Sequence, residues 1–352
     1  MSKISQFFST NRGRTNFNRR EIYYGPTTAT FTAASPGLVE VNCWGGGGNG
    51  GPQAGGGGGG AGYVRYIYDL SAGDQLSISV AGAGGTSSVS CPTQSPISPI
   101  IATGGLPGST FAAPYPTTGV DTDGGAGGVG VGTVPSSRVS YLLTRDGGTG
   151  SNGHYDALSS QWFGGGGGAA GNEYADGTSN VADPLEPFHD GTPQYPHVIA
   201  GAGIAGAGDS RSITTWDPTI NPHPTGLANQ VGTGGPGNWH ENLGAPKTSD
   251  FENWFFSYEQ RGGQGGRAAI FYPEGPLYSI TSAATDGGFL AGGAGGNRFG
   301  PGTGNGGYNT EVVQASNGGY GGGGGGGGQN GPSYPVVHGQ GGAGVVIVYY
   351  VI

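Results

Sequence analysis

Eight consecutive glycines, GGGGGGGG at residues 321–328, lie near the end of a 352-residue chain that contains 83 glycines. Each glycine held in a regular element costs roughly 0.5–1 kcal/mol more backbone entropy than alanine. Over the whole chain this cost is on the order of 40–80 kcal/mol, several times the ~5–15 kcal/mol net stability of a folded domain. Such runs are therefore either disordered or stabilised by an interaction that only side-chain-free backbone can make.

The overall composition favours an ordered chain. Charged residues make up 10% of the sequence and the net charge is −9, whereas disorder is typical of chains with high net charge and few aromatic residues. Aromatic residues reach 10% here. The apolar residues suffice for one compact core, so the rest of the chain must be held together by other means.

Glycine-rich runs recur along the chain without being periodic. They lie at 45–62, 81–85, 124–132, 147–150, 164–171, 201–208, 232–237, 262–266, 287–296, 300–307, 318–328 and 339–344. Polyglycine can form an extended left-handed helix of the polyproline II type, with about 3 residues per turn and no internal hydrogen bonds. Helices without side chains can approach until their N–H and C=O groups pair, and this pairing would offset the entropy cost. We therefore expect a polyglycine II helix bundle.

Ordinary β sequence lies at the two ends of the chain. Residues 28–32 with 38–44, and 63–70 with 75–80, are predicted as two antiparallel hairpins, and 344–352 (GVVIVYYVI) as a central closing strand. The predicted fold is mostly β and irregular with almost no α-helix. A small antiparallel β-sandwich framework, residues 26–85 plus 339–352, encloses a glycine-rich excursion with long aromatic loops, residues 86–338.

The first 25 residues form a basic segment with an apolar pattern. Five cations and no acids occur in residues 1–20, and an apolar helical spacing follows Ser2. This pattern fits docking onto a protein partner better than binding nucleic acid, and the alternative is a solvated leader without a role. The docking candidates are Ile4, Phe7, Phe8, Arg12, Arg14, Arg19 and Arg20.

Targeting signals and cysteines are sparse. We find no secretory signal and no apolar run approaching ~18 residues, so we expect synthesis in the cytoplasm without a signal peptide and no membrane insertion. Cys43 and Cys91 are too few for a disulfide scaffold and are predicted to be ordinary thiols.

Motifs for catalysis, cofactors or metals are weak. Lys247 follows Gly-Ala-Pro rather than completing a phosphate-binding loop, and no G-x-S-x-G elbow occurs. The stretch at 121–124 (DTDG) opens like a calcium loop, but Gly132 stands where the twelfth-position glutamate is required. The histidines show no metal-binding spacing. We therefore expect no enzyme, no cofactor and no metal.

Aromatic residues are frequent between the glycine runs. Tryptophan and tyrosine bury large areas with few rotatable bonds and are enriched at binding hot spots. Capping the ends of the glycine bundle is the alternative role for any one ring. The receptor-contact candidates are Trp162, Trp216, Trp239, Trp254 and Tyr258.

The ensemble of end motifs resembles a known family. VEVNCWGGGGNGG (39–51), GGAGYVRYIYDLSAGDQLSISVAGAGG (59–85) and GGAGVVIVYYVI (341–352) are similar to the glycine-rich domain of bacteriophage tail fibre and tail-associated proteins. The excursion also resembles distal adhesins of T-even-related phages. The resemblance implies a polyglycine II sandwich whose variable tip loops bind a bacterial surface receptor, and it carries no contact residue over by position.

The resemblance leads to an expected function. We expect a virion protein of the tail or another appendage, docked by its N-terminal segment to other virion proteins and contacting a protein or glycan receptor on the host; a homo-oligomer is compatible with this role. The alternative is a purely structural decoration, shaft or filament subunit, whose loop aromatics would be buried between subunits. An ice-binding bundle would need a strict Gly-x-x repeat, which the chain lacks.

Overall fold

The part of the chain that the computed structural model describes is all β. It comprises residues 17, 19–53, 55–93, 99–110, 120–132, 142–156, 161–172, 176, 177, 179, 270–272, 279–282, 290–293, 297, 298, 312, 313, 315–327 and 338–352. These residues form antiparallel strands and extended segments and contain no helix, which confirms the expectation of a mostly β chain. Accordingly, none of these residues belongs to a helix that could cross a membrane.

The first sheet contains the closing strand at its centre. Its order is β1 (Arg19–Tyr24), β17 (Val345–Tyr350), β3 (Gly37–Trp44), β4 (Tyr63–Leu70) and β10 (Leu142–Arg145), all antiparallel. The sequence of β17, VVIVYY, is apolar on both faces, and both faces are buried. The C-terminal strand therefore returns between two N-terminal strands, as its unbroken apolar sequence predicted.

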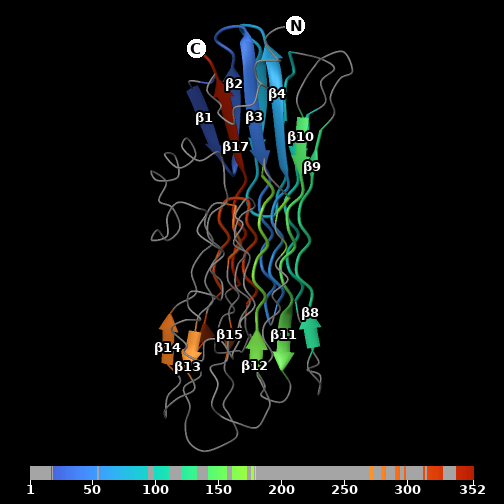
Figure 1. The fold of residues 1–352 in the computed structure, drawn as a ribbon, viewed down its shortest axis with the longest axis vertical. Coiled ribbons are helices and arrows are strands. Elements are labelled where there is room, and N and C mark those ends of the chain that lie inside the picture. Colours follow the sequence, from blue (N-terminus) through green and yellow to red (C-terminus); the bar gives the residue numbers. More distant parts are fainter. Residues whose placement is uncertain are drawn as a thin grey trace, which may run out of the picture.

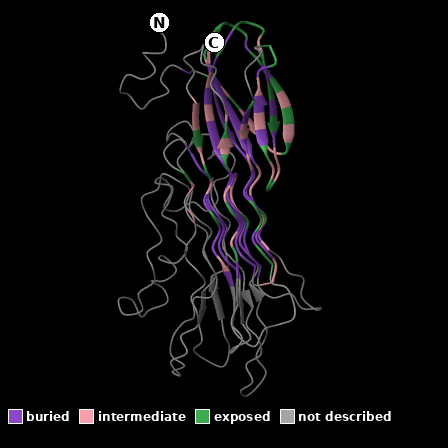
Figure 2. Ribbon diagram, turned by 90° about the vertical axis from the view of Figure 1, so that its right-hand side faces the viewer, coloured by how far each residue is buried: buried purple, intermediate pink, exposed green. Residues whose placement is uncertain are grey.

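A second sheet shares a hydrophobic core with the first. Its order is β2 (Thr27–Thr32), β5 (Gln75–Val80), β6 (Ser87–Ser90), β7 (Ile100–Ala102) and β9 (Gly130–Val131). In β5 the apolar residues at alternate positions are buried and the polar ones are exposed. They join one cluster with Val41, Tyr66 and Val348 from the first sheet. We call these two sheets the framework (Figures 1 and 2).

The two predicted hairpins are wrong in their pairing. β2 pairs with β5, and β3 pairs with β4, so each turn carries the chain from one sheet to the other. The turns instead bond to each other, because Ala33 N–H donates to Asp74 C=O (2.9 Å) and Gly73 N–H donates to Ala33 C=O (2.8 Å). All four strands contribute buried residues to the shared core, so each crossing places two consecutive strands on opposite sides of that core.

The framework also begins earlier than the predicted boundary at residue 26. Arg19–Tyr24 form β1, and its register with β17 runs from Arg19↔Tyr350 to Tyr24↔Val345. Phe17, just before β1, is buried, and its ring lies 6.4 Å from that of Tyr349. The end of the predicted docking segment is thus part of the first sheet.

Extended glycine segments leave the framework side by side (Figure 1). We call them rods; those described lie at 45–51, 55–62, 103–109, 123–129, 146–151, 164–172, 290–293, 315–319, 321–327 and 338–344. They pair laterally through backbone hydrogen bonds of 2.7–3.3 Å. Most of their residues are buried (Figure 2), although few side chains are present to cover them.

The hydrogen bonds of rod 55–62 repeat every third residue. Its successive N–H groups donate to three different rods in turn: 55, 58 and 61 to rod 321–327; 56, 59 and 62 to rod 103–109; 57 and 60 to rod 146–151. Its carbonyls accept, in the same rotation, from rods 164–172, 45–51 and 123–129. Rod 55–62 is therefore bonded on all sides, to six neighbours.

Rod 321–327, from the octaglycine, is surrounded in the same way. Its hydrogen-bonded neighbours are rods 45–51, 55–62, 164–172, 290–293, 315–319 and 338–344. An added Cβ at Gly323 would lie 1.9 Å from the carbonyl oxygen of Gly58, and one at Gly57 would lie 2.0 Å from that of Gly166. Only glycine fits at these positions, because the rods are closer than a methyl group allows.

Short strands lie at the far end of the rods from the framework (Figure 1). One sheet has the order β16 (Val312–Val313), β15 (Asn297–Arg298), β12 (Gln161–Phe163), β11 (Gly153–Asp156) and β8 (Val120–Thr122). A separate pair consists of β13 (Ile270–Tyr272) and β14 (Ser279–Ser282). We call these strands the distal strands.

Candidate functional site

The distal strands are direct continuations of the rods. β8 ends at Thr122, where rod 123–129 begins, and β11 begins at Gly153, directly after rod 146–151 and Asn152. β12 ends at Phe163 and continues into rod 164–172. The lateral hydrogen bonds of these rods therefore fix the positions at which β8 ends, β11 begins and β12 ends.

Trp162 is the candidate contact residue that the structure places. It lies in β12, the middle strand of the distal sheet, opposite Tyr155 of β11 and Arg298 of β15 in the register. The register therefore brings an aromatic and a cationic residue alongside Trp162 at the end of the molecule opposite the framework. The other candidates, Trp216, Trp239, Trp254 and Tyr258, lie outside the described residues.

The docking candidates divide between described and undescribed parts of the chain. Arg19 and Arg20 lie in β1, opposite Tyr350 and Tyr349 of β17, with Arg19 exposed and Arg20 half-buried. The remaining candidates lie outside the described residues: Ile4, Phe7, Phe8, Arg12 and Arg14. The described cations of this set are thus at the framework end, away from Trp162.

Trp44 joins the framework to the rods, a role that was not predicted from the sequence. Its indole Nε1–H donates to the carbonyl of Gly171 (2.8 Å), and its ring lies 4.7 Å from that of Tyr63. Both rings are fully buried in a second core cluster that includes Ala61 and Leu290 from the rods. Trp44 is the last residue of β3 and directly precedes a glycine run, a position that signals this junction in the sequence.

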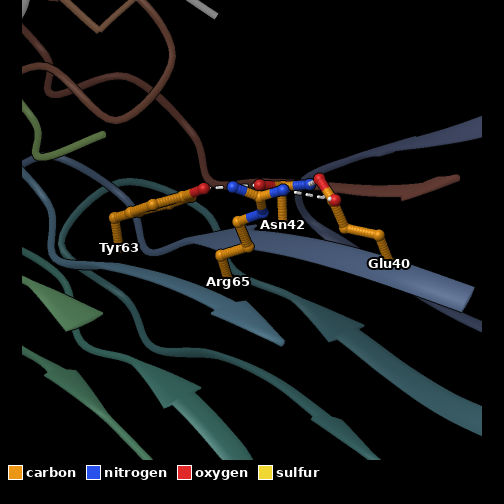
Figure 3. Close-up of polar contacts among 4 residues, drawn as sticks. All are labelled: Glu40, Asn42, Tyr63 and Arg65. Atoms are coloured by element: carbon orange, nitrogen blue, oxygen red, sulfur yellow. Dashed lines mark hydrogen bonds and ion pairs between the residues drawn. The ribbon is translucent and has the colours of Figure 1, made fainter. Parts of the chain in front are cut away.

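A polar network crosses β3 and β4 beside this junction (Figure 3). Arg65 Nη2 donates to Glu40 Oε2 (2.7 Å), and Asn42 Nδ2 donates to Glu40 Oε1 (2.8 Å). Tyr63 O–H in turn donates to Asn42 Oδ1 (2.5 Å). Glu40 and Asn42 are fully buried, and both carboxylate oxygens are already bonded, so this arrangement suits holding the two strands in register rather than acting on a substrate.

The two cysteines are free thiols in the framework core, as the sequence predicted. Burial raises the pKa of the Cys43 thiol to about 12, and a hydrogen bond with the Ala102 backbone opposes this shift. Cys43 is therefore protonated and unreactive near neutral pH, because the thiolate is the nucleophilic form.

Metal ligands are not gathered in the described part of the chain. No group of three or more His, Cys, Asp or Glu residues there could hold a metal ion. In the calcium-like stretch, Asp121 lies in β8 opposite His154 of β11. The stretch continues directly into rod 123–129, and its Gly124 N–H donates to Asn152 Oδ1 (3.1 Å).

Comparison with known proteins adds no assignment to this geometry. No protein-family model and no curated protein matches the chain.

Proposed function

We propose that this chain is a phage virion appendage protein, a tail fibre or tail-tip adhesin that presents loops on a rigid glycine bundle for binding to the host surface. The observation that carries the proposal is the separation of framework and distal strands by the rods (Figure 1). One end contains both β1 and the closing strand β17, and the other contains strands that leave and re-enter the bundle. Such a molecule suits attachment at one end and contact at the other.

We further propose that the rods are polyglycine II helices and that the framework is a β-sandwich. The three-residue rotation of hydrogen-bond partners around rod 55–62 supports the first point, because polyproline II geometry has three residues per turn. The core shared by the two framework sheets supports the second. A polyglycine II rod of seven residues would be about 22 Å long.

Rigidity follows from this arrangement and supports adhesion. Lateral bonds hold each rod at several points along its length, so the distal strands are positioned by backbone rather than by side-chain packing. Loops held in place lose less entropy on binding than free loops would. In this proposal Trp162, Trp216, Trp239, Trp254 and Tyr258 contact a bacterial receptor, protein or glycan.

The framework end is the proposed attachment end. Ile4, Phe7, Phe8 and the basic residues from Arg12 to Arg20 would dock onto other virion proteins, with homo-oligomers compatible with this geometry. The chain as a whole has a net charge of −9, but residues 1–20 carry five cations and no acids. This basic segment suits an acidic surface on a protein partner. The proposed location is the virion surface, and no catalytic, cofactor or nucleic-acid role is proposed.

Adsorption of phage particles tests the function. Particles assembled with residues 209–261 replaced by a glycine-serine linker of equal length should lose attachment to the host, whereas particles with the S88A substitution in the framework should attach normally. Normal attachment by the loop-replaced particles would refute these loops as the receptor site. Electron microscopy with an antibody against the framework gives the position, and a shaft or capsid location would favour a purely structural role.

A further inference from the structure

Rod 146–151 lies at the surface of the bundle, and one row of its N–H donors bonds to none of the rods that the structure describes. The N–H groups of 147 and 150 donate to rod 123–129, and those of 148 and 151 donate to rod 164–172. In a three-residue rotation the third row consists of the N–H groups of Asp146 and Thr149. Both residues are exposed, so this row faces outward.

Two side chains accept hydrogen bonds from the N–H groups of this third row. Asp176 Oδ1 accepts from Asp146 N–H, and Ser179 Oγ accepts from Thr149 N–H, each at 3.1 Å. Between them Gly177 N–H donates to the Asp146 carbonyl (2.6 Å). Positions 176 and 179 are three residues apart, as are 146 and 149, so the acceptors match the repeat of the rod.

The same substitution of side-chain oxygens for carbonyls occurs elsewhere on the bundle. Asn317 Oδ1 accepts from Gln340 N–H (2.9 Å), and Thr103 Oγ1 accepts from Val129 N–H (2.7 Å). Both bonds are exposed to solvent. In both cases a short polar side chain of an adjacent rod supplies the acceptor in place of a backbone carbonyl.

We propose that Asp176 and Ser179 close the lateral edge of the glycine bundle and prevent a second copy of this chain from adding to it. An open row of N–H groups on a glycine rod is equivalent to the open edge of a β-sheet, which pairs with other chains unless it is covered or charged. Asp176 does both, since its carboxylate bonds one donor and places a negative charge at the edge. This edge closure is independent of any receptor-binding role.

The test is the double variant D176A/S179A of the full chain, compared with D176N/S179T. Alanine removes both acceptors, whereas asparagine and threonine retain an oxygen at each position. Hydrogen exchange, measured by mass spectrometry on peptides covering 142–156, reports the amides of Asp146 and Thr149. Sedimentation velocity over a concentration series reports self-association relative to the unchanged protein.

The expected result is exchange on the order of 10-fold faster at these amides in D176A/S179A, with concentration-dependent association. D176N/S179T should match the unchanged protein in exchange. Unchanged exchange in D176A/S179A would overturn the proposed hydrogen bonds, and faster exchange without association would overturn the role in limiting pairing. If the double variant does not fold, S179A alone, which uncovers only Thr149, is judged by the same two measurements.

Discussion

Replacing one glycine of the octaglycine by alanine should destabilise the protein strongly. In G323A the new Cβ would lie 1.9 Å from the carbonyl oxygen of Gly58, where ordinary contact begins at 3.4 Å. The two rods involved, 321–327 and 55–62, are each bonded to six neighbours, so neither can move freely. Relief of the clash requires the rods to separate by about 1.5 Å, because 3.4 minus 1.9 is 1.5.

That separation would break the three hydrogen bonds that join the two rods. Gly55, Gly58 and Ala61 donate to rod 321–327 at 3.1, 2.8 and 2.7 Å. Each buried group left without a partner costs about 1–3 kcal/mol, giving roughly 3–9 kcal/mol for three bonds. The entropy gained on replacing glycine offsets only about 0.4–1 kcal/mol of this. The loss is comparable to the ~5–15 kcal/mol stability of a typical domain.

Urea unfolding followed by tryptophan fluorescence measures the effect. G37A is the matched control, because a Cβ at Gly37 meets no atom within 4 Å and should leave the midpoint unchanged or slightly raised. G59A should lie between them, since its Cβ meets the Ala126 carbonyl at 2.0 Å on a surface rod that can move outward. If the unfolding free energies of G323A and G59A lie within 1 kcal/mol of that of G37A, close packing of the rods is refuted. If G323A does not fold, the unfolding free energy of G59A alone decides.

Three further predictions concern the framework and its junction. R65M should destabilise the protein by about 2–4 kcal/mol in urea unfolding, because it removes the ion-pair partner of the buried Glu40 carboxylate. The double variant E40Q/R65M should recover more than half of that loss. A loss below 1 kcal/mol in R65M would contradict a stabilising role for the pair. W44F should cost about 1–3 kcal/mol in urea unfolding followed by far-UV circular dichroism, because the buried Gly171 carbonyl loses its donor. Equal stability would argue against this anchor. The raised pKa of Cys43 contributes stability below about pH 9, and this stability is lost as the pH rises toward 12. The unfolding free energy of C43A should therefore fall less steeply between pH 8 and 11 than that of the unchanged protein. Equal slopes of unfolding free energy against pH would show that the thiol is not responsible.

The sequence predicted strands better than it predicted their partners. The apolar run of β17 and the alternation of β5 identified these strands, because burial follows directly from the position of apolar residues. The pairing failed for β2 with β3 and for β4 with β5, since a short turn between two strands is compatible with either a hairpin or a crossing between sheets. What decided between them is a contact between two turns, Ala33 with Gly73 and Asp74, about 40 residues apart, which no local pattern contains.

The candidate site was predictable to a smaller extent, since loop aromatics follow no periodicity. Trp162 illustrates this limit. The local sequence QWF at 161–163 gives no signal of a middle strand, and the residues opposite Trp162 in the register are Tyr155 and the distant Arg298. Trp44 shows the reverse case. Its adjacency to a glycine run is visible in the sequence, but its bond to Gly171 depends on a rod that begins 120 residues later.

The composition of each rod follows from how many neighbours it has. Among the rods that the structure describes, the two with six neighbours, GGGGGGAG at 55–62 and GGGGGGG at 321–327, contain almost no side chains. The surface rod DGGAGGV at 123–129 has a side chain at every third position, and these three residues, Asp123, Ala126 and Val129, are its exposed ones. A three-residue repeat is therefore present within short surface runs, although no repeat extends along the whole chain. Unbroken glycine predicts the centre of such a bundle, and Gly-Gly-x predicts its surface, because a Cβ is tolerated only on the one side of three that faces solvent.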